Sequence, residues 1–188
     1  MDMYKLKWTR LQQRIFRLLC IKVGQSFNLR GIAKLLGVSP TAVSNVLHDL
    51  EKERLIKMEK SKTMNLISIE FNRDNEKAIN LKRVENLKLI YESELDKFLE
   101  NEFPGCTIIL FGSYSRGEDV WFGETDDRSS DIDIAIIGTK GKTIDLTKFE
   151  EKLERKIFIN FYKSWDEIHK NLRNNILNGI LLSGSIEL

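Results

Sequence analysis

Apolar residues in the first 72 positions recur in patterns typical of three short helices followed by two strands. Residues 10–23, 28–36 and 40–52 carry apolar side chains at spacings of three, four and seven residues, which places them on one helical face. Residues 55–58 and 66–71 are shorter, and the second alternates apolar with polar positions, as a half-buried strand does. We therefore expect a small helical unit that ends in a β-hairpin.

A long charged segment, residues 74–103, is predicted to be one continuous helix. Asp74 is a candidate cap, and Pro104-Gly105 is a stop signal. An apolar stripe on this helix must be covered by another part of the protein or by a second chain. The stripe consists of Leu81, Val84, Leu87, Tyr91, Leu95 and Phe98. The C-terminal half is expected to pack on the protein's own domains. For the rest, a seam with a second copy of the chain stays open, which would suit a two-fold DNA site.

Beyond residue 104, short apolar runs alternate with helical patterns, which predicts a small α/β domain. Buried strands are expected at residues 106–111, 131–137 and 156–162. Thr147 and Glu150 have the spacing of a capping box at the start of a helix. A last helix is expected over residues 165–178, with Ile180 packed onto the sheet.

Charge is distributed unevenly, although the whole chain carries only +2. Residues 1–71 contain 13 Lys and Arg against 6 Asp and Glu, a net +7, whereas residues 72–188 contain 17 against 22, a net −5. A basic N-terminal third joined to an acidic remainder indicates two parts with different partners.

Cysteine usage and hydropathy narrow the class of protein. Cys20 and Cys106 lie far apart in apolar surroundings, so they predict core thiols rather than a disulfide framework or a zinc site. Residues 1–10 contain no apolar signal region, and no apolar run approaches the roughly 18 residues that a membrane helix needs. A cytoplasmic protein is expected.

The predicted strand at residues 106–111 runs into Gly112-Ser113, where we expect the chemistry of the chain. Glycine lets the backbone approach a ligand closely, and Ser113 can cap the helix that follows. Such a junction offers free N–H groups to a phosphate. Asp131 and Asp133, two apart on a strand, point to one face, which suits a divalent metal carrying a nucleoside triphosphate.

These residues resemble the nucleotidyltransferase fold shared with DNA polymerase beta, and most closely its small, antitoxin-like prokaryotic members. The shared pattern is an apolar residue, Gly-Ser, a spacer and Asp-apolar-Asp, and it covers about residues 104–163. The resemblance implies that Mg²⁺ or Mn²⁺ on the catalytic pair Asp131 and Asp133 bridges the triphosphate, while Gly112 and Ser113 hold its outer phosphates. A hydroxyl of an unknown acceptor then attacks the α-phosphorus and releases pyrophosphate.

Two residues after Ser113, Arg116 and Trp121, each have two possible roles. Arg116 either clamps the triphosphate through its guanidinium fork or forms a surface ion pair with Glu118 or Asp119. The 17 residues that separate the two halves of the motif are rich in acids. They are expected to form a solvated loop anchored by Trp121, and the alternative is a lid over the nucleotide with Trp121 stacked on the base.

The chain departs from the family at the third carboxylate, which the family carries on the strand after its connecting helix. The candidate positions here are Phe158 and Asn160, and neither is acidic. An asparagine can offer an oxygen to a metal but cannot act as a base. Whether the chain is an enzyme stays open. The alternatives are a catalytically inactive nucleotide-sensing transcriptional regulator and an antitoxin-like partner of a toxin-like protein.

Residues 8–71 resemble a winged helix-turn-helix domain, through the segment 29–39 and the basic hairpin. Ser39 and Pro40 suit the N-cap and first position of its third helix. The resemblance implies DNA binding, and a protein-docking or dimerisation module is the alternative. Contacts are expected to base edges from Thr41, Ser44, Asn45 and His48 and to phosphates from Lys57, Lys60 and Lys62.

Together these patterns predict an α+β protein in three parts. They are a winged helix-turn-helix domain at residues 1–72, a connecting helix at 73–103, and a nucleotidyltransferase-like α/β domain with a small mixed sheet at 104–188. DNA and a nucleoside triphosphate are the expected partners.

Overall fold

The protein divides into two compact units, residues 1–79 and 80–188, called here the N-terminal unit and the C-terminal unit. The structure, a computed structural model, describes residues 8–60, 67–123 and 129–187. Among these residues, no helix combines the length and the apolar character needed to cross a bilayer.

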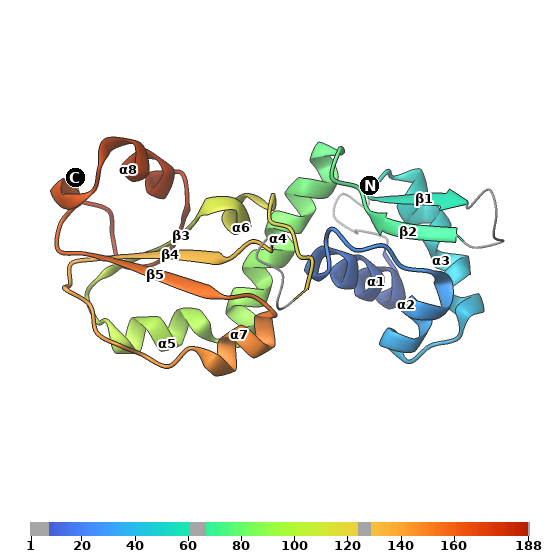
Figure 1. Cartoon of the computed structure of the whole chain (residues 1–188), viewed down its shortest axis with the longest axis horizontal. Helices are drawn as coiled ribbons and strands as arrows, with labels where there is room; N and C mark the ends of the chain where they lie inside the picture. Colours follow the sequence, from blue (N-terminus) through green and yellow to red (C-terminus); the bar gives the residue numbers. More distant parts are fainter. Residues whose placement is uncertain (1–7, 61–66, 124–128, 188) are drawn as a thin grey trace, which may run out of the picture. The chain divides into compact units, whose positions relative to one another are not determined.

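Three helices and a hairpin build the N-terminal unit (Figure 1). The elements are α1 (Arg10–Ile21), α2 (Leu29–Leu36), α3 (Pro40–Lys52), β1 (Ile56–Lys60) and β2 (Ile67–Phe71). The two strands pair antiparallel, and a bridge from Phe27 to Ile69 adds the segment before α2 to the hairpin. This order and pairing confirm the predicted winged helix-turn-helix fold.

Local signals determine where these helices begin and end. Asn28 and Ser39 each accept a hydrogen bond from the backbone N–H three residues later, at 2.8 Å and 3.1 Å, and so cap α2 and α3. Gly37 ends α2 with a φ of +65°, a conformation that favours glycine. The core that the helices and the hairpin share includes Ile15, Leu19, Ile32, Val43, Leu47, Leu50 and Ile69.

A four-stranded mixed sheet organises the C-terminal unit. Its strands are β3 (Thr107–Phe111), β4 (Ile132–Ile137), β5 (Ile157–Tyr162) and β6 (Ile180–Ser183), in the order β5-β4-β3-β6. The β4–β5 pair is parallel and the other two pairs are antiparallel, which confirms the mixed sheet.

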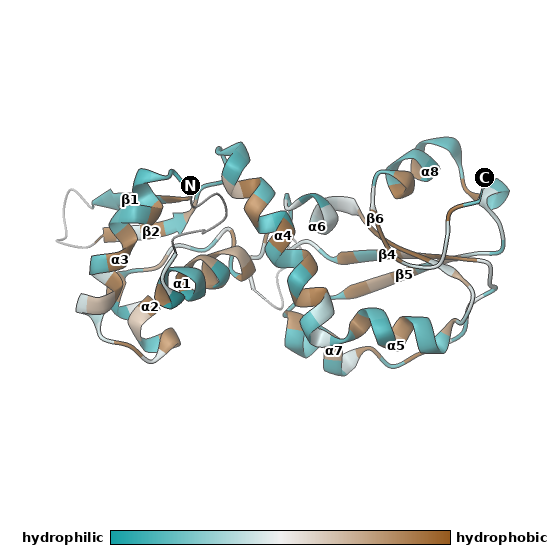
Figure 2. Cartoon of the chain, turned by 180° about the vertical axis from the view of Figure 1, so that it is seen from behind, coloured by the Kyte–Doolittle hydropathy of each residue, from teal (hydrophilic) through white to brown (hydrophobic). Residues whose placement is uncertain are grey.

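Helices cover both faces of this sheet. They are α4 (Glu76–Ser93), α5 (Leu95–Glu102), α6 (Gly112–Arg116), α7 (Thr147–Leu153) and α8 (Lys170–Leu177), with a 3₁₀ turn η1 (Trp165–Glu167). Helices α5 and α7 lie on one face and α8 on the other (Figure 1). Figure 2 shows β4 and β5 as mainly hydrophobic ribbons, as expected of strands enclosed between two layers.

The predicted connecting helix is wrong as one continuous element, because the chain breaks at Glu94. Glu94 has a φ of +65° and separates α4 from α5. Extending the buried face of α4 by helical spacing would bring Lys97 inward, whereas the break buries Leu95 and Leu99 instead. The buried face of α4 itself consists of Ala78, Lys82, Asn86, Leu89, Ile90 and Ser93.

The predicted apolar stripe of this helix is also wrong over α4. Val84 is 63% exposed and Tyr91 is 45% exposed, so neither lies in a core. The face that is buried carries a lysine and an asparagine, which hydrophobic spacing alone assigns to solvent. Asn75, rather than Asp74, supplies the side-chain bond at the start of α4, because its Oδ1 accepts from the backbone N–H of Ala78 at 3.2 Å.

Two further predictions near the C-terminus need correction. The last helix is shorter than predicted, and Ile180 begins the edge strand β6 instead of packing onto the sheet from outside it. Thr147 and Glu150 form no capping box, since α7 has no side-chain cap and the Asp145 carboxylate accepts from the Thr147 N–H at 2.9 Å. The Glu150 carboxylate instead accepts from the backbone N–H of Ile157 at 3.0 Å.

Candidate functional site

The turn from β3 into α6 is packed directly against β4. Phe111 ends β3 opposite Asp133 of β4, and Gly112 follows with a φ of +75°. A β-carbon built on Gly112 would overlap the Asp133 carboxylate. Glycine is therefore required at this position for two reasons, the left-handed backbone and the close approach of a carboxylate.

Asp131 and Asp133 lie at the start of β4. Asp131 precedes the strand and Asp133 is its second residue, and both side chains are partly buried. Gly112 contacts the Asp133 carboxylate, and the charge of Asp131 acts on the same carboxyl group, so Gly112, Asp131 and Asp133 lie close together.

Burial and a neighbouring negative charge raise the pKa of both carboxyl groups. For Asp133 the larger cause is desolvation, followed by the charge of Asp131, and the Arg116 guanidinium acts in the opposite direction. For Asp131 the causes are desolvation and then the charge of Glu150. Two carboxylates that disfavour each other's ionised form are stabilised by a cation placed between them.

The donor set fits a divalent metal that shares its ligands with a substrate. Carboxylate oxygens are the ligands that Mg²⁺ and Mn²⁺ prefer, and Mg²⁺ is commonly held by one or two carboxylates plus phosphate oxygens and water. The residues that the structure describes contain no cluster of three or more potential metal ligands. Asp131 and Asp133 alone would hold the ion on the protein side.

Arg116 forms the surface ion pair that was one of its two predicted readings, whereas the predicted cap from Ser113 is wrong. The Arg116 Nε donates to the Glu118 carboxylate at 2.7 Å and its Nη1 donates to the Asn175 side chain on α8 at 3.2 Å. Ser113 does not cap α6, because Phe111 occupies the N-cap position and makes no side-chain cap bond. Ser113 is instead the second residue of the helix and is partly exposed.

The third-acid position is occupied by an aromatic side chain. In the parallel pairing of β4 with β5, Phe158 lies beside Asp133 and Asn160 lies beside Ala135. Phe158 is 54% exposed. The position closest to the carboxylate pair on β5 is therefore apolar and open to solvent.

Sequence reasoning missed a buried polar cluster next to this turn. Asp119, expected in a solvated loop, is 1% exposed and forms ion pairs with Lys82 and Arg155. Asn86 of α4 donates to Asp119 at 2.7 Å. Lys82 and Asn86 are four residues apart and share the buried face of α4 with Ala78 and Ile90, but hydrophobic spacing alone gave no signal for burial of a lysine and an asparagine.

The aromatic residue of the insert is an anchor. Trp121 is 7% exposed, so it is packed into the unit rather than displayed over the carboxylates. On either side of Trp121, the backbone N–H groups of Val120 and Phe122 donate to the hydroxyls of Ser130 and Ser129. The acids Glu124, Asp126 and Asp127 of this insert lie outside the described residues.

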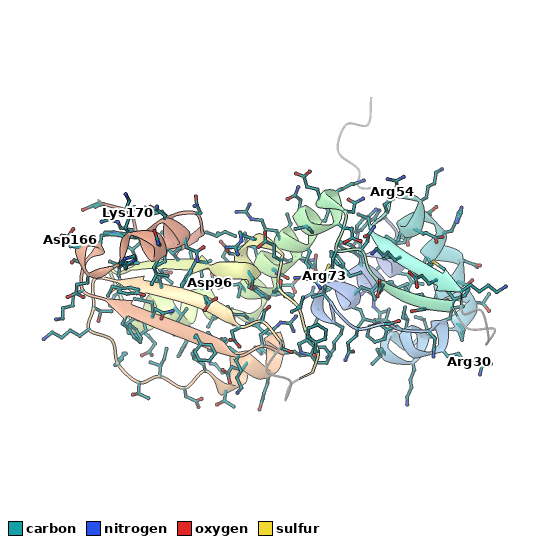
Figure 3. The ribbon with its side chains drawn as sticks, turned by 45° about the horizontal axis from the view of Figure 1, so that its top comes forward. Arg30, Arg54, Arg73, Asp96, Asp166 and Lys170 are labelled. Atoms are coloured by element: carbon teal, nitrogen blue, oxygen red, sulfur yellow. The ribbon has the colours of Figure 1, made fainter. Side chains whose placement is uncertain are left out.

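The predicted DNA-contacting residues of the N-terminal unit lie on its surface. Thr41, Ser44, Asn45 and His48 are all exposed along one side of α3. Lys60 is exposed at the end of β1, Lys57 pairs with Asp74 at 2.5 Å, and Lys62 lies outside the described residues. Figure 3 shows two further cations of this unit, Arg30 of α2 and Arg54 after α3, extending outward.

Comparison with known proteins identifies the C-terminal part. Residues 92–180 match the family model described as a nucleotidyltransferase domain. A search of curated proteins found no match.

Solved structures that resemble part of the chain are bacterial regulators. A variant of Lactococcus lactis ZitR is 25% identical over 50% of this chain and 68% of its own, with a TM-score of 0.39. The Streptococcus pyogenes adhesin competence repressor AdcR is 20% identical over 54% and 71%, with a TM-score of 0.41. MepR of S. aureus, solved with DNA, is 23% identical over 52% and 67%, with a TM-score of 0.38.

These scores are low, so the N-terminal assignment rests on the order, caps and pairing of its own elements. For the C-terminal unit, the family match spans the Gly112 turn, both aspartates and the sheet around them. Residues 92–180 of this chain match a nucleotidyltransferase domain, and a unit with the winged helix-turn-helix fold precedes them.

Proposed function

We propose that the C-terminal unit binds a nucleoside triphosphate with Mg²⁺ or Mn²⁺ and transfers its nucleoside monophosphate to a hydroxyl acceptor. The observation that carries the proposal is the packing of Gly112 against the Asp133 carboxylate. This packing places a bare backbone turn and an acid pair in one small space. A metal-bound phosphate chain has the chemistry that matches both.

Each residue of the site has a role in this proposal. Asp131 and Asp133 hold the metal, which when bound neutralises phosphate charge and orients the triphosphate. Gly112 and Ser113 hold the outer phosphates. Arg116 reaches a phosphate by exchanging its surface ion pair for a charge-assisted bond to the ligand.

The transfer requires a proton acceptor, and the third carboxylate that helps the family in this step is replaced here by Phe158. The acceptor oxygen bonds to the α-phosphorus, the bond to the bridging oxygen of the β-phosphate breaks, and pyrophosphate leaves with that electron pair. The hydroxyl proton passes to water or to a carboxylate. Phe158 beside Asp133 leaves the third-acid position on β5 without a carboxylate for this step, so slow transfer is expected.

Phe158 also favours a second candidate, a nucleotide-sensing transcriptional regulator without transfer activity. Incubation with NTP labelled at the α-phosphate separates the two, using nucleic acid and toxin-like protein acceptors. Label on an acceptor and release of pyrophosphate support the enzyme. Tight NTP binding with no label transferred, even in a Phe158→Asp variant that supplies a third carboxylate, supports the sensor. Phe158→Ala controls for loss of the ring.

We further propose that the N-terminal unit binds DNA with the exposed side of α3 in the major groove. Short donors and acceptors at Ser44, Asn45 and His48 can reach base edges, and the net +7 of residues 1–71 supplies attraction to phosphates. Fluorescence anisotropy with labelled duplexes tests this. Affinity should fall steeply with salt, and Asn45→Ala with His48→Ala should reduce sequence preference. Affinity independent of salt would contradict the proposal.

A further inference from the structure

A buried polar cluster lies against the nucleotide turn and has no part in the proposed transfer. The Asp119 cluster, as we call it, consists of Lys82 and Asn86 of α4, Asp119, and Arg155 between α7 and β5, and all four are at most 5% exposed. Lys82 Nζ bonds one Asp119 oxygen, and Arg155 Nη2 donates to the other at 3.2 Å. All four residues belong to the C-terminal unit.

Asn86 connects this cluster directly to α6. Its Nδ2 donates to the Asp119 carboxylate at 2.7 Å and to the backbone carbonyl of Tyr114 at 2.9 Å. The same carbonyl accepts from the Gly117 N–H at 3.2 Å. One amide group therefore ties the middle of α6 to α4.

Helix α6 needs such an outside support because it is only five residues long. A single helical turn fixes several backbone dihedrals for very few hydrogen bonds and is unstable by itself. Its own supports are the Ser115 hydroxyl, which donates to the Gly112 carbonyl at 2.9 Å, and the left-handed Gly117 at its end. Its first residue is the Gly112 that contacts Asp133.

Asp119 supports the C-terminal end of α6. It lies two residues after Gly117 and is held by side chains from two other segments. One of these, Arg155, immediately precedes Lys156, whose carbonyl accepts from the Ile132 N–H at 2.8 Å where β4 begins between the two aspartates. The cluster thus touches the end of α6 and, through this neighbouring residue, the start of β4.

We propose that Asn86 and Asp119 are positioning residues of the nucleotide site. By holding the Tyr114 carbonyl and the segment after Gly117, they fix α6 so that Gly112 lies against the acid pair. They touch neither phosphate nor metal. This inference rests on the proposed function for its effect on nucleotide, and on the contacts alone for its effect on α6.

Asn86→Ala is the sharpest variant, because Asp119 substitutions would leave two buried cations facing each other. Its matched control is Ser93→Ala, which also removes two buried hydrogen bonds of an α4 side chain, because the Ser93 hydroxyl donates to the Ile90 carbonyl and accepts from the Leu95 N–H. Both variants are made in the full chain. Amide hydrogen exchange over residues 112–118 and calorimetric affinity for Mg²⁺–ATP and Mg²⁺–GTP are measured for both.

Asn86→Ala should speed exchange over residues 112–118 by roughly tenfold and weaken nucleotide binding by a similar factor, as expected for loss of the buried hydrogen bond to the Tyr114 carbonyl, the one that holds α6 directly. Ser93→Ala should change neither. Equal exchange over these residues in the two variants would overturn the positioning role. Faster exchange only in Asn86→Ala, together with no nucleotide binding by the wild type, would uphold the support of α6 and reject the proposed function.

Discussion

The two proposed binding surfaces of this protein are built in opposite ways. On α3, Ser44, Asn45 and His48 stand in solvent, where polar groups are fully hydrated. At the nucleotide turn, Asp131 and Asp133 are partly buried with raised pKa values, and Gly112 is confined against one of them. The polar side chains on α3 therefore do not lower the stability of the ligand-free protein. The two partly buried carboxylates do lower it, and a bound cation would remove this cost.

Two glycines with nearly the same φ angle provide the largest expected contrast. Gly112 and Gly37, with φ of +75° and +65°, both lose roughly 1–2 kcal/mol of stability on substitution by Ala, because the left-handed region disfavours a side chain. Gly112→Ala additionally drives its β-carbon into Asp133, while Gly37→Ala meets no atom within 4 Å. We expect Gly112→Ala to abolish nucleotide binding in calorimetry and Gly37→Ala to leave it unchanged.

Equal nucleotide affinity in the Gly112→Ala and wild-type proteins would show that the turn does not contact the ligand. The Gly37→Ala variant controls for general loss of stability, which chemical denaturation of both variants measures.

Asp133→Asn should stabilise the protein at neutral pH. The folded-state pKa of Asp133 is raised above its ordinary 3.8, so the ionised group opposes folding at pH 7. This unfavourable contribution diminishes as the pH falls through the raised pKa and is gone below 3.8, where both states are protonated. The free energy of unfolding, measured by denaturant at pH 7 and pH 4, should favour the variant more at pH 7.

A variant that is less stable than the wild type at pH 7 would contradict this reading of the acid pair. It would mean that the Asp133 carboxylate makes a favourable contact in the free protein, and the contrast between the two surfaces would lose its electrostatic basis.

The smallest effects are expected at the basic hairpin. Lys60 is exposed at the end of β1, so Lys60→Ala should reduce the salt dependence of DNA affinity by roughly one phosphate contact. Lys57 already pairs with Asp74, which raises its pKa through their hydrogen bond, so Lys57→Ala should change the slope less. Anisotropy titrations over a range of salt concentrations measure both slopes, and equal slopes in both variants would remove the distinction.

Local sequence signals carried most of the N-terminal fold. Ser39 and Pro40 mark the start of the third helix by chemistry that acts within three residues, and the structure confirms this boundary. The C-terminal motif was equally readable, since Gly112 and the two aspartates are defined by residue type and spacing.

What could not be predicted depends on distant partners. Lys82 and Asn86 read as solvent-facing until Asp119, more than 30 residues away, is known to lie beside them. The break at Glu94 was missed for a related reason, because the buried face of α4 includes three polar side chains and hydrophobic spacing assigned the wrong side. The short edge strand β6 is stabilised by pairing with β3, which its four residues do not reveal.

The most direct test of this account is calorimetric titration of ATP and GTP, with and without Mg²⁺, into the wild type and the Asp131→Asn/Asp133→Asn double variant. We expect nucleotide binding that requires Mg²⁺ in the wild type and is lost in the double variant. Equal affinity in the two proteins, or no binding by the wild type under any condition, would contradict a nucleotide site at the acid pair.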